Sequence, residues 1–298
     1  KTQADKVAAL NIYYVGYLRE GVARLADLMH QPAVAAEARR RADQTAALTR
    51  RLFWSPRHRL VVDNLPRLAQ DGELRLHDRT SAMALGYGII PAGQEQTTLD
   101  LLAGLPTHES PPMFPLPGEK GVIGFSFTAN TCWRYWALTR FGRGEAVVRD
   151  LEERWGSMIS LAQNKTFSEW WHPRPSVKGE VWAQNTQVPI FLLYGHILGI
   201  TPTQPAFAKF DVRPQRGSLR FIEGTAHSPS GGIRLRCDGG AESLELSLDV
   251  PAGLEPALVL PAGWQPRNIP AVSPESFAVR GFSRWRLPRM ETPHRWEI

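Results

Sequence analysis

The sequence predicts an α-helical domain followed by an antiparallel β-sandwich. Up to about Ile200, apolar residues recur at helical spacing in segments that loops separate. From Phe210 onward they alternate in short segments between Gly, Pro and Ser turns, and the change of pattern falls at residues 199–202. The 298 residues leave room for two domains of about 100 to 200 residues each. We therefore expect a helical domain over residues 1–202 and a sandwich over residues 203–298.

The helical domain is expected to contain roughly seven helices in pairs joined by loops. The first lies within residues 7–25, the second begins at Pro32 and ends at Trp54-Ser55-Pro56, and the third is capped by Asp78 or Thr80 and stops at Gly88. Further helices are expected over residues 94–105, 128–140, 143–161 and 181–198, with a proline-rich loop at 106–124. Residues 60–62 form a short strand candidate, but no strand pattern between the helices predicts a parallel sheet.

The sandwich prediction depends on short apolar alternations in the last third of the chain. They lie between turn residues, as is typical of two packed antiparallel sheets. The segments are 219–222, 232–236, 244–250, 257–260 and 276–279.

Composition and charge exclude several classes of protein. Hydrophobic residues make up 43% and charged residues 21%, which is typical of a globular chain rather than a disordered one or an integral membrane protein. The net charge is +6, but the arginines are spread along the chain, and the run Arg39-Arg40-Arg41 is interpreted as the solvated face of a helix. We therefore expect no nucleic-acid partner and no membrane span.

Cofactor and metal sites find no support in the sequence. The two cysteines, Cys132 and Cys237, are too few and too far apart for a disulfide framework or a zinc site. Cys132 lies among tryptophans on a helix and is interpreted as an inert packed thiol. No glycine-rich phosphate loop, Gly-x-Ser-x-Gly turn or His-Glu-x-x-His pair occurs, so neither a cofactor nor a metal is expected.

The segment Lys165–Pro173 is the strongest candidate for chemistry. It places Glu169 among the aromatic residues Phe167, Trp170 and Trp171, next to His172 and before a loop rich in Pro and Gly. Partial desolvation would raise the pKa of that carboxyl group and suit it to act as a general base. Two interpretations remain open at this point: a general base, or a loop glutamate that caps a helix or pairs with an arginine.

Three other acidic positions have simpler explanations. Asp78, beside His77, lies at a helix N-terminus, where an oxygen atom satisfies free amides whether or not a substrate binds. Glu180, close to Trp182, also lies near a helix N-terminus, where the helix dipole favours its charge, although it could share a cleft with Glu169. The acids of residues 150–153 are interpreted as the solvated face of an amphipathic helix.

Taken together and in order, these segments resemble the C-terminal part of the bacterial α-L-rhamnosidases of glycoside hydrolase family 78. The likeness covers nearly the whole chain, and it depends on the succession of motifs rather than on any single one. The motifs are residues 124–130 (GFSFTAN), 155–158 (WGSM), 166–170 (TFSEW), Trp182, 197–202 (ILGITP), 210–214 (FDVRP) and 224–233 (GTAHSPSGGI).

The resemblance implies an (α/α)6 six-hairpin barrel followed by a β-sandwich, and an inverting hydrolase that removes terminal α-L-rhamnose from polysaccharides or glycosides. In that family the Thr-x-x-Glu-Trp type motif carries the general base, which implies this role for Glu169. The sugar site would be lined by Glu180, Trp182, Trp171, His172 and Asp78. Many members place a sugar-contacting His where this sequence has Glu180. A carboxylate in place of an imidazole can change which sugar binds, so the implied substrate is rhamnose or a related sugar.

The resemblance also implies an incomplete barrel. The family's general acid belongs to an Asp-Cys-Pro-x-Arg-x-Glu type motif that does not occur in these 298 residues, and about seven helices are too few for the twelve of the barrel. The sequence opens at Lys1, without an initiator Met and inside a helical pattern. We therefore expect a piece of a longer enzyme, whose N-terminal part is a partner of this chain and supplies the acid.

Two functions of other classes stay open. One is a non-catalytic carbohydrate-binding or scaffold protein derived from such an enzyme. The other is a chain in which the sandwich alone binds polysaccharide. Seven of the ten tryptophans lie in the helical part, which is compatible with a packed core or with a carbohydrate cleft.

Overall fold

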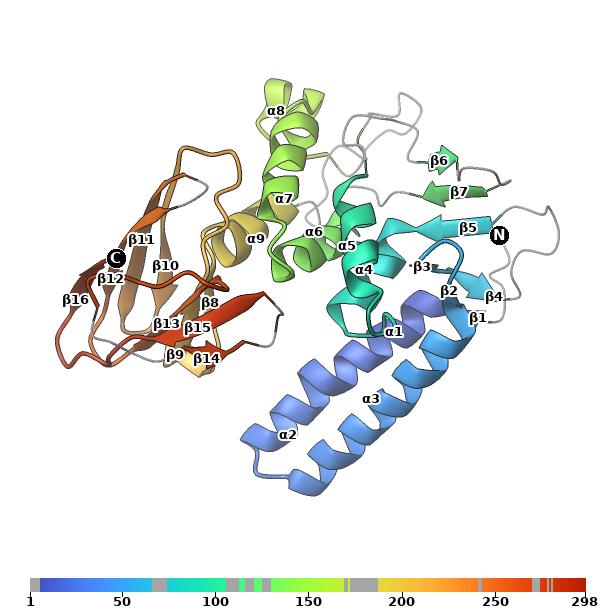
Figure 1. The fold of residues 1–298 in the computed structure, drawn as a ribbon, viewed down its shortest axis with the longest axis horizontal. Coiled ribbons are helices and arrows are strands. Elements are labelled where there is room, and N and C mark those ends of the chain that lie inside the picture. Colours follow the sequence, from blue (N-terminus) through green and yellow to red (C-terminus); the bar gives the residue numbers. More distant parts are fainter. Residues whose placement is uncertain are drawn as a thin grey trace. The chain divides into compact units, whose positions relative to one another are not determined.

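The structure is a computed structural model, and it places two compact units along the chain (Figure 1). One unit consists of the described residues up to Ala137 with Ser168 and Trp171, and the other of residues 138–167 and the described residues from Gln187 onward. The described residues are 6–65, 74–105, 113–115, 121–124, 130–168, 171, 187–240, 243–269, 274–277, 279 and 281–298.

The first unit begins with an antiparallel helical hairpin (Figure 1). Helix α1 (Ala8–Gly16) continues through a π-helical segment, Tyr17–Ala23, into α2 (Arg24–Leu28), and α3 (Pro32–Phe53) returns alongside it. Pro32 occupies the first turn of α3, where its missing N–H has no intrahelical partner to lose. The inward face of α3 carries small residues three or four positions apart, which allows close packing: Ala35, Ala38, Ala42 and Ala46. Both predicted helices are confirmed.

The arginine run lies on the solvated face of α3, as expected. Arg40 and Arg41 each hold a carboxylate oxygen of Glu37 at 2.7 Å, and Arg39 pairs with Asp27 of α2. All of these side chains are about half exposed. The charges of these arginines are therefore paired with carboxylates of the same hairpin.

Short strands connect the helices of the first unit, and here one expectation is wrong. Strand β5 (Leu74–His77) runs parallel to β7 (Gly121–Gly124), which pairs antiparallel with β6 (Met113–Pro115). A parallel pair therefore exists between the helices. Each strand has only three or four residues and its partner lies far along the chain, so local periodicity carried too little signal. The other pairs are β1 (Lys6–Val7) with β4 (Asn64–Leu65), and β2 (Trp54–Ser55) with β3 (Leu60–Val61), the latter at the predicted strand.

Three more helices pack in this unit. Helix α4 (Asp78–Gly86) is buried along most of its length, and α5 (Glu95–Ala103) and α6 (Thr131–Arg140) follow it. The guanidinium group of Arg134 in α6 is fully buried and donates hydrogen bonds to the carbonyl groups of Leu102 and Leu105 at the end of α5. An arginine thus satisfies carbonyl groups that the end of a helix leaves free.

The second unit departs from the predicted helices at one place. A single helix was expected over residues 143–161, but α7 (Gly144–Asp150) and a π-helical segment, Leu151–Trp155, end at Gly156, and α8 (Ile159–Asn164) starts after an extended residue, Met158. The expectation of a solvated acidic face is also wrong in part. Asp150 and Arg154 are buried, and of the three acids only Glu152 is fully exposed.

The last predicted helix is described from Val188 onward. Helix α9 (Val188–Leu192) continues into a π-helical segment, Leu193–Ile197, and ends at Gly199. Residues 181–186 of the expected helix lie outside the described residues.

The sandwich is built from two sheets (Figure 1). One has the order β10-β11-β12-β16 and is antiparallel throughout, and the other has the order β14-β15-β13-β9-β8. The strands are β8 (Ile200–Pro202), β9 (Lys209–Val212), β10 (Phe221–Ser228), β11 (Gly231–Gly239), β12 (Leu244–Val250), β13 (Glu255–Pro261), β14 (Glu275–Ser276), β15 (Phe282–Arg286) and β16 (His294–Glu297). All described strand pairs of the sandwich are antiparallel except β9 with β13, which is a correction to the expected antiparallel sandwich.

Burial follows the sheet positions. In β11 and β12 buried and more exposed residues alternate, as in strands with one face on the core, whereas β13 is buried from Pro256 to Leu260 because it lies in the middle of its sheet. The predicted strand over residues 276–279 is reduced to the two residues of β14, and Val279 is buried outside a strand.

Candidate functional site

The predicted catalytic segment is described only in part. Glu169, His172, Glu180 and Trp182 lie outside the described residues, and Trp171 is described and partly exposed. The structure therefore gives the surroundings of this segment on its N-terminal side, and the role of each of these residues stays a prediction.

The chain is firmly held just before Glu169. Helix α8 ends at Lys165, which adopts the left-handed conformation, and the ring of Phe167 packs edge-on against Trp155 with 5.1 Å between ring centroids. Trp155 is 2% exposed, and Ser168 is also buried. Phe167 is therefore packed within the second unit, and Ser168 is buried.

A polar cluster surrounds the start of α4. His77 has extended backbone angles and is the N-cap, so the prediction that Asp78 or Thr80 caps this helix is off by one residue or more. Asp78 is the first helical residue, and its Oδ1 accepts a hydrogen bond of 2.7 Å from the backbone N–H of Arg79 and lies 2.9 Å from Nδ1 of His77. The expected satisfaction of a free amide by an oxygen atom is thus present, supplied from inside the first turn.

Exposure differs sharply between the two members of this pair. The side chain of Asp78 is 1% exposed, whereas that of His77 is 26% exposed. A buried carboxylate that holds one ring nitrogen of a histidine fixes the orientation of the ring and leaves the other nitrogen for a ligand or a proton. Asp78 can therefore act on a bound molecule through His77, as a positioning residue.

Asp63 completes the cluster, although no motif in the sequence singles it out. Its carboxylate accepts a hydrogen bond from the Thr80 hydroxyl. Burial raises the pKa of Asp63 above its usual range, although the hydrogen bond to Thr80 and the charges of His77 and Arg79 act in the opposite direction. A carboxyl group that keeps its proton to a higher pH lies close to a carboxylate–imidazole pair. Only its position after the buried strand residues Val61 and Val62 could have drawn attention to it.

Aromatic rings pack beside this cluster. Tyr13 of α1 meets Trp133 of α6 edge-on at 4.9 Å, Trp133 meets Trp136 at 5.9 Å, and Tyr87 lies 5.0 Å from Trp136. Part of the tryptophan concentration seen in the sequence therefore forms a packed layer between helices. Tyr13 remains 45% exposed, so the layer reaches the surface there.

The thiol group of Cys132 fits its predicted inert role, and Cys237 resembles it. Burial raises the pKa of Cys132 to about 11 and that of Cys237 to about 11, so both are protonated at neutral pH. No group of three or more His, Cys, Asp or Glu side chains that could hold a metal ion occurs among the described residues. Nor, in the same part of the chain, is any helix both long and apolar enough to cross a membrane.

One family model matches part of the chain. Residues 199–268 match the model of the bacterial α-L-rhamnosidase C-terminal domain. No curated protein matches the sequence.

Several solved structures are similar over most of the chain, and three of them are rhamnosidases. The α-L-rhamnosidase of Streptomyces avermitilis, complexed with L-rhamnose, has 16% identity and a TM-score of 0.64 over 98% of this chain and 26% of that chain. A family 78 rhamnosidase of Bacillus sp. GL1 has 20% identity and a TM-score of 0.59 over 80% of this chain and 24% of that one. The α-L-rhamnosidase of Dictyoglumus thermophilum has 14% identity and a TM-score of 0.62 over 96% and 31%.

These similarities have a defined reach. At such identities the structural likeness concerns the fold, and this chain spans 24% to 31% of the length of each of these relatives. The (α/α)6 barrel stays a prediction for the helical part. The resemblance read from the motifs is confirmed in these terms: residues 199–268 match the model of the bacterial α-L-rhamnosidase C-terminal domain, and most of the chain is similar in fold to part of the solved α-L-rhamnosidases.

Proposed function

We propose that this chain is the C-terminal part of an inverting glycoside hydrolase that removes terminal α-L-rhamnose, or a related sugar, from polysaccharides or glycosides. The observation that carries the proposal is the match of residues 199–268 to the rhamnosidase C-terminal domain, preceded in order by the Thr166–Trp170 motif. The domain division proposed is 1–202 for the part of the catalytic barrel and 203–298 for the sandwich.

Glu169, in the Thr166–Trp170 motif, is proposed as the general base. Inversion requires one carboxylate to activate water on one face of the sugar and one protonated carboxyl group to assist the leaving group on the other, about 6.5 to 9.5 Å apart. The packing of Phe167 against Trp155 supports this role, because it orders the chain close to Glu169, and a base must be held at a constant distance from the water it activates. The partner carboxyl group is supplied by a part of the enzyme outside these 298 residues.

The sugar site is proposed to include Glu180, Trp182, Trp171 and His172. Tryptophan rings offer flat apolar faces to a sugar ring, and the polar groups fix its hydroxyl groups. Asp78 contributes by orienting His77, whose side chain is the more exposed of the two.

The test uses the complete enzyme with Glu169→Gln. Loss of a general base lowers kcat by about 100-fold or more while substrate binding is retained. Glu152→Gln, an exposed acid of the π-helical segment, is the matched control and should keep normal turnover. Sodium azide should restore consumption of an activated α-L-rhamnoside by Glu169→Gln, with the azide appearing in the product in inverted configuration.

Two results would overturn the assignment. One is near-normal turnover of Glu169→Gln. The other is an initial sugar product of retained anomeric configuration in proton NMR, because that requires a covalent intermediate and a different role for the carboxylates. If the complete protein binds rhamnosides but never hydrolyses them, the non-catalytic carbohydrate-binding alternative replaces the proposal.

A further inference from the structure

We infer that a concave region at one end of the sandwich binds an oligosaccharide. The region has a volume of about 870 Å³ and lies between the start of β12, the loop that follows β13 and the last residue, Ile298. This volume falls within the range of about 300 to 1,000 Å³ that is usual for small-molecule sites. Its polar side chains and its one tryptophan are Ser243, Glu245, Trp264, Gln265, Arg267 and Asn268.

The wall of this region is shaped by a tight loop. Two residues in the left-handed conformation, Gly263 and Asn268, stand on either side of its centre, and the backbone N–H of Trp264 donates a hydrogen bond of 3.0 Å to the carbonyl group of Pro261. Opposite the loop, Leu246 and Ile298 exchange two backbone hydrogen bonds of 2.8 and 2.9 Å. Backbone hydrogen bonds therefore hold both walls, so binding loses little conformational entropy in ordering them.

Most polar side chains of this region have no partner among the described residues. Among the described residues, Glu245, Gln265, Arg267 and Asn268 make no side-chain hydrogen bond or ion pair, and the indole of Trp264 has no ring partner. A carboxylate, two amides and a guanidinium group thus line one hollow with their hydrogen-bonding capacity directed only to solvent.

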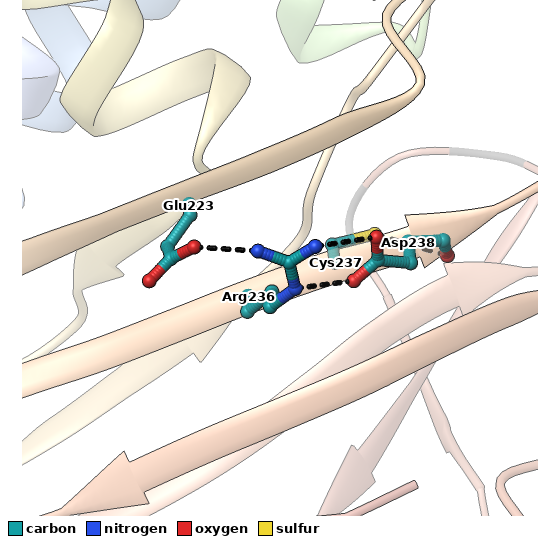
Figure 2. Close-up of polar contacts among 4 residues, drawn as sticks. All are labelled: Glu223, Arg236, Cys237 and Asp238. Atoms are coloured by element: carbon teal, nitrogen blue, oxygen red, sulfur yellow. Dashed lines mark hydrogen bonds and ion pairs between the residues drawn. The ribbon is translucent and has the colours of Figure 1, made fainter.

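Elsewhere the sandwich pairs its charges. Figure 2 shows Arg236 between two carboxylates, with 2.7 Å from Nε to Asp238 and 2.7 Å to Glu223. Its guanidinium group also lies 4.6 Å from the centre of the Phe221 ring. Other pairs at 2.8 Å or less are Arg284 with Asp211, Arg286 with Glu275, and Lys209 with Glu255. The hollow at Trp264 therefore differs from these paired sites.

The chemistry of the hollow fits a sugar better than a charged ligand. It combines a positive and a negative group with neutral amides, so its net charge favours neither an anion nor a cation, while amides and a carboxylate hydrogen-bond hydroxyl groups. A partly exposed indole provides a face on which a pyranose ring can stack. The choice of rhamnose-containing oligosaccharides as ligands rests on the proposed function, whereas the site itself does not.

The experiment titrates the 298-residue chain with an α-L-rhamnose-containing oligosaccharide and, separately, with a maltooligosaccharide of equal length. Binding is measured by calorimetry and by the indole N–H signals in NMR. The rhamnose-containing ligand should bind and shift the Trp264 signal, and Trp264→Ala should weaken binding by about tenfold or more. Trp264→Phe keeps an aromatic face and should retain part of the affinity. Phe221→Ala, which removes an exposed ring from the same sandwich, should bind normally.

Each outcome decides a separate point. If neither oligosaccharide binds, the proposed site is wrong. It is also wrong if Trp264→Ala and Phe221→Ala lose affinity equally. Binding of the maltooligosaccharide alone overturns the choice of sugar. Equal unfolding midpoints for the two alanine variants exclude misfolding as the cause of a loss. Hydrolysis by the complete enzyme is measured separately, so a failure of the proposed catalytic role is distinguishable from a failure of this site.

Discussion

Gly16→Ala should destabilise the first unit, although helix propensity alone predicts the opposite. Gly16 has ordinary helical backbone angles, φ −60° and ψ −46°, so alanine there would be favoured by about 1 kcal/mol in an open helix. A Cβ atom at Gly16 would, however, lie 2.6 and 2.8 Å from Cε1 and Cε2 of Tyr87 and closer still to Cζ. The ring would have to withdraw by about 1 Å to restore an ordinary contact of about 3.5 Å.

The ring of Tyr87 has little freedom to withdraw. It packs against Trp136 at 5.0 Å and Trp133 at 6.3 Å, which belong to the aromatic layer between α1, α4 and α6. Forcing an extra carbon into a packed site costs about 1 to 3 kcal/mol, and the whole ring edge is involved, so we take the upper end. After subtracting the gain in helix propensity, the net loss is about 2 kcal/mol.

Gly21 supplies the matched control on the same helical stretch. A Cβ atom there would meet only Tyr17, at 3.7 Å, which is an ordinary contact. Gly21→Ala should therefore raise stability, by about 0.5 to 1 kcal/mol. Urea unfolding followed by tryptophan fluorescence measures both variants against the wild type. A stabilised Gly16→Ala, or equal shifts of the same sign in the two variants, would refute the packing argument.

Two further predictions concern pH and activity. Burial, aided by the charge of Arg213, lowers the pKa of His196 to about 4. The neutral imidazole therefore contributes its full stability above the unfolded-state pKa of about 6.5. That contribution is lost as the pH falls from there towards 4, by at most about 3 kcal/mol. Urea unfolding at pH 7 and pH 4.5 should show a smaller acid loss in His196→Gln than in the wild type, and equal losses would contradict the assignment. These 298 residues alone should release little or no rhamnose from an α-L-rhamnoside, because the general-acid motif does not occur in them. Robust hydrolysis, measured as free rhamnose, would show that an acid lies within the chain, and Glu73 would be the first residue to replace.

Much of the helical hairpin and the sandwich could be predicted because their signals are local. The alanine spacing of α3, Pro32 at its start and the alternation in β11 and β12 each report an environment through a few neighbouring residues. The change of pattern at Gly199 combines a local requirement with a distant one. This glycine adopts φ +78°, and a Cβ atom there would collide with the backbone of Arg213.

The rest depended on partners that are distant in sequence. The parallel pairing of β5 with β7 joins strands of four residues, and the burial of Asp150 on α7 reverses what an acidic helical face indicates. Asp63 is a functional candidate only because α4 comes close to it and supplies Thr80. Such features arise from tertiary packing, which overrides local preference.

The parallel pairing of β9 with β13 constrains the order in which the sandwich can assemble. Strands β10, β11 and β12 follow one another as a meander, each paired with its predecessor across a short connection. Strands β9 and β13 stand on either side of that meander in sequence, so joining them closes all of the intervening chain into one loop, and the entropy cost of closure grows with loop length. Once the meander has formed, the effective loop is short. The hairpins of one sheet thereby lower the entropic barrier to forming the other, and a substitution in the turn between β10 and β11 acts on the assembly rate of a sheet to which it does not belong.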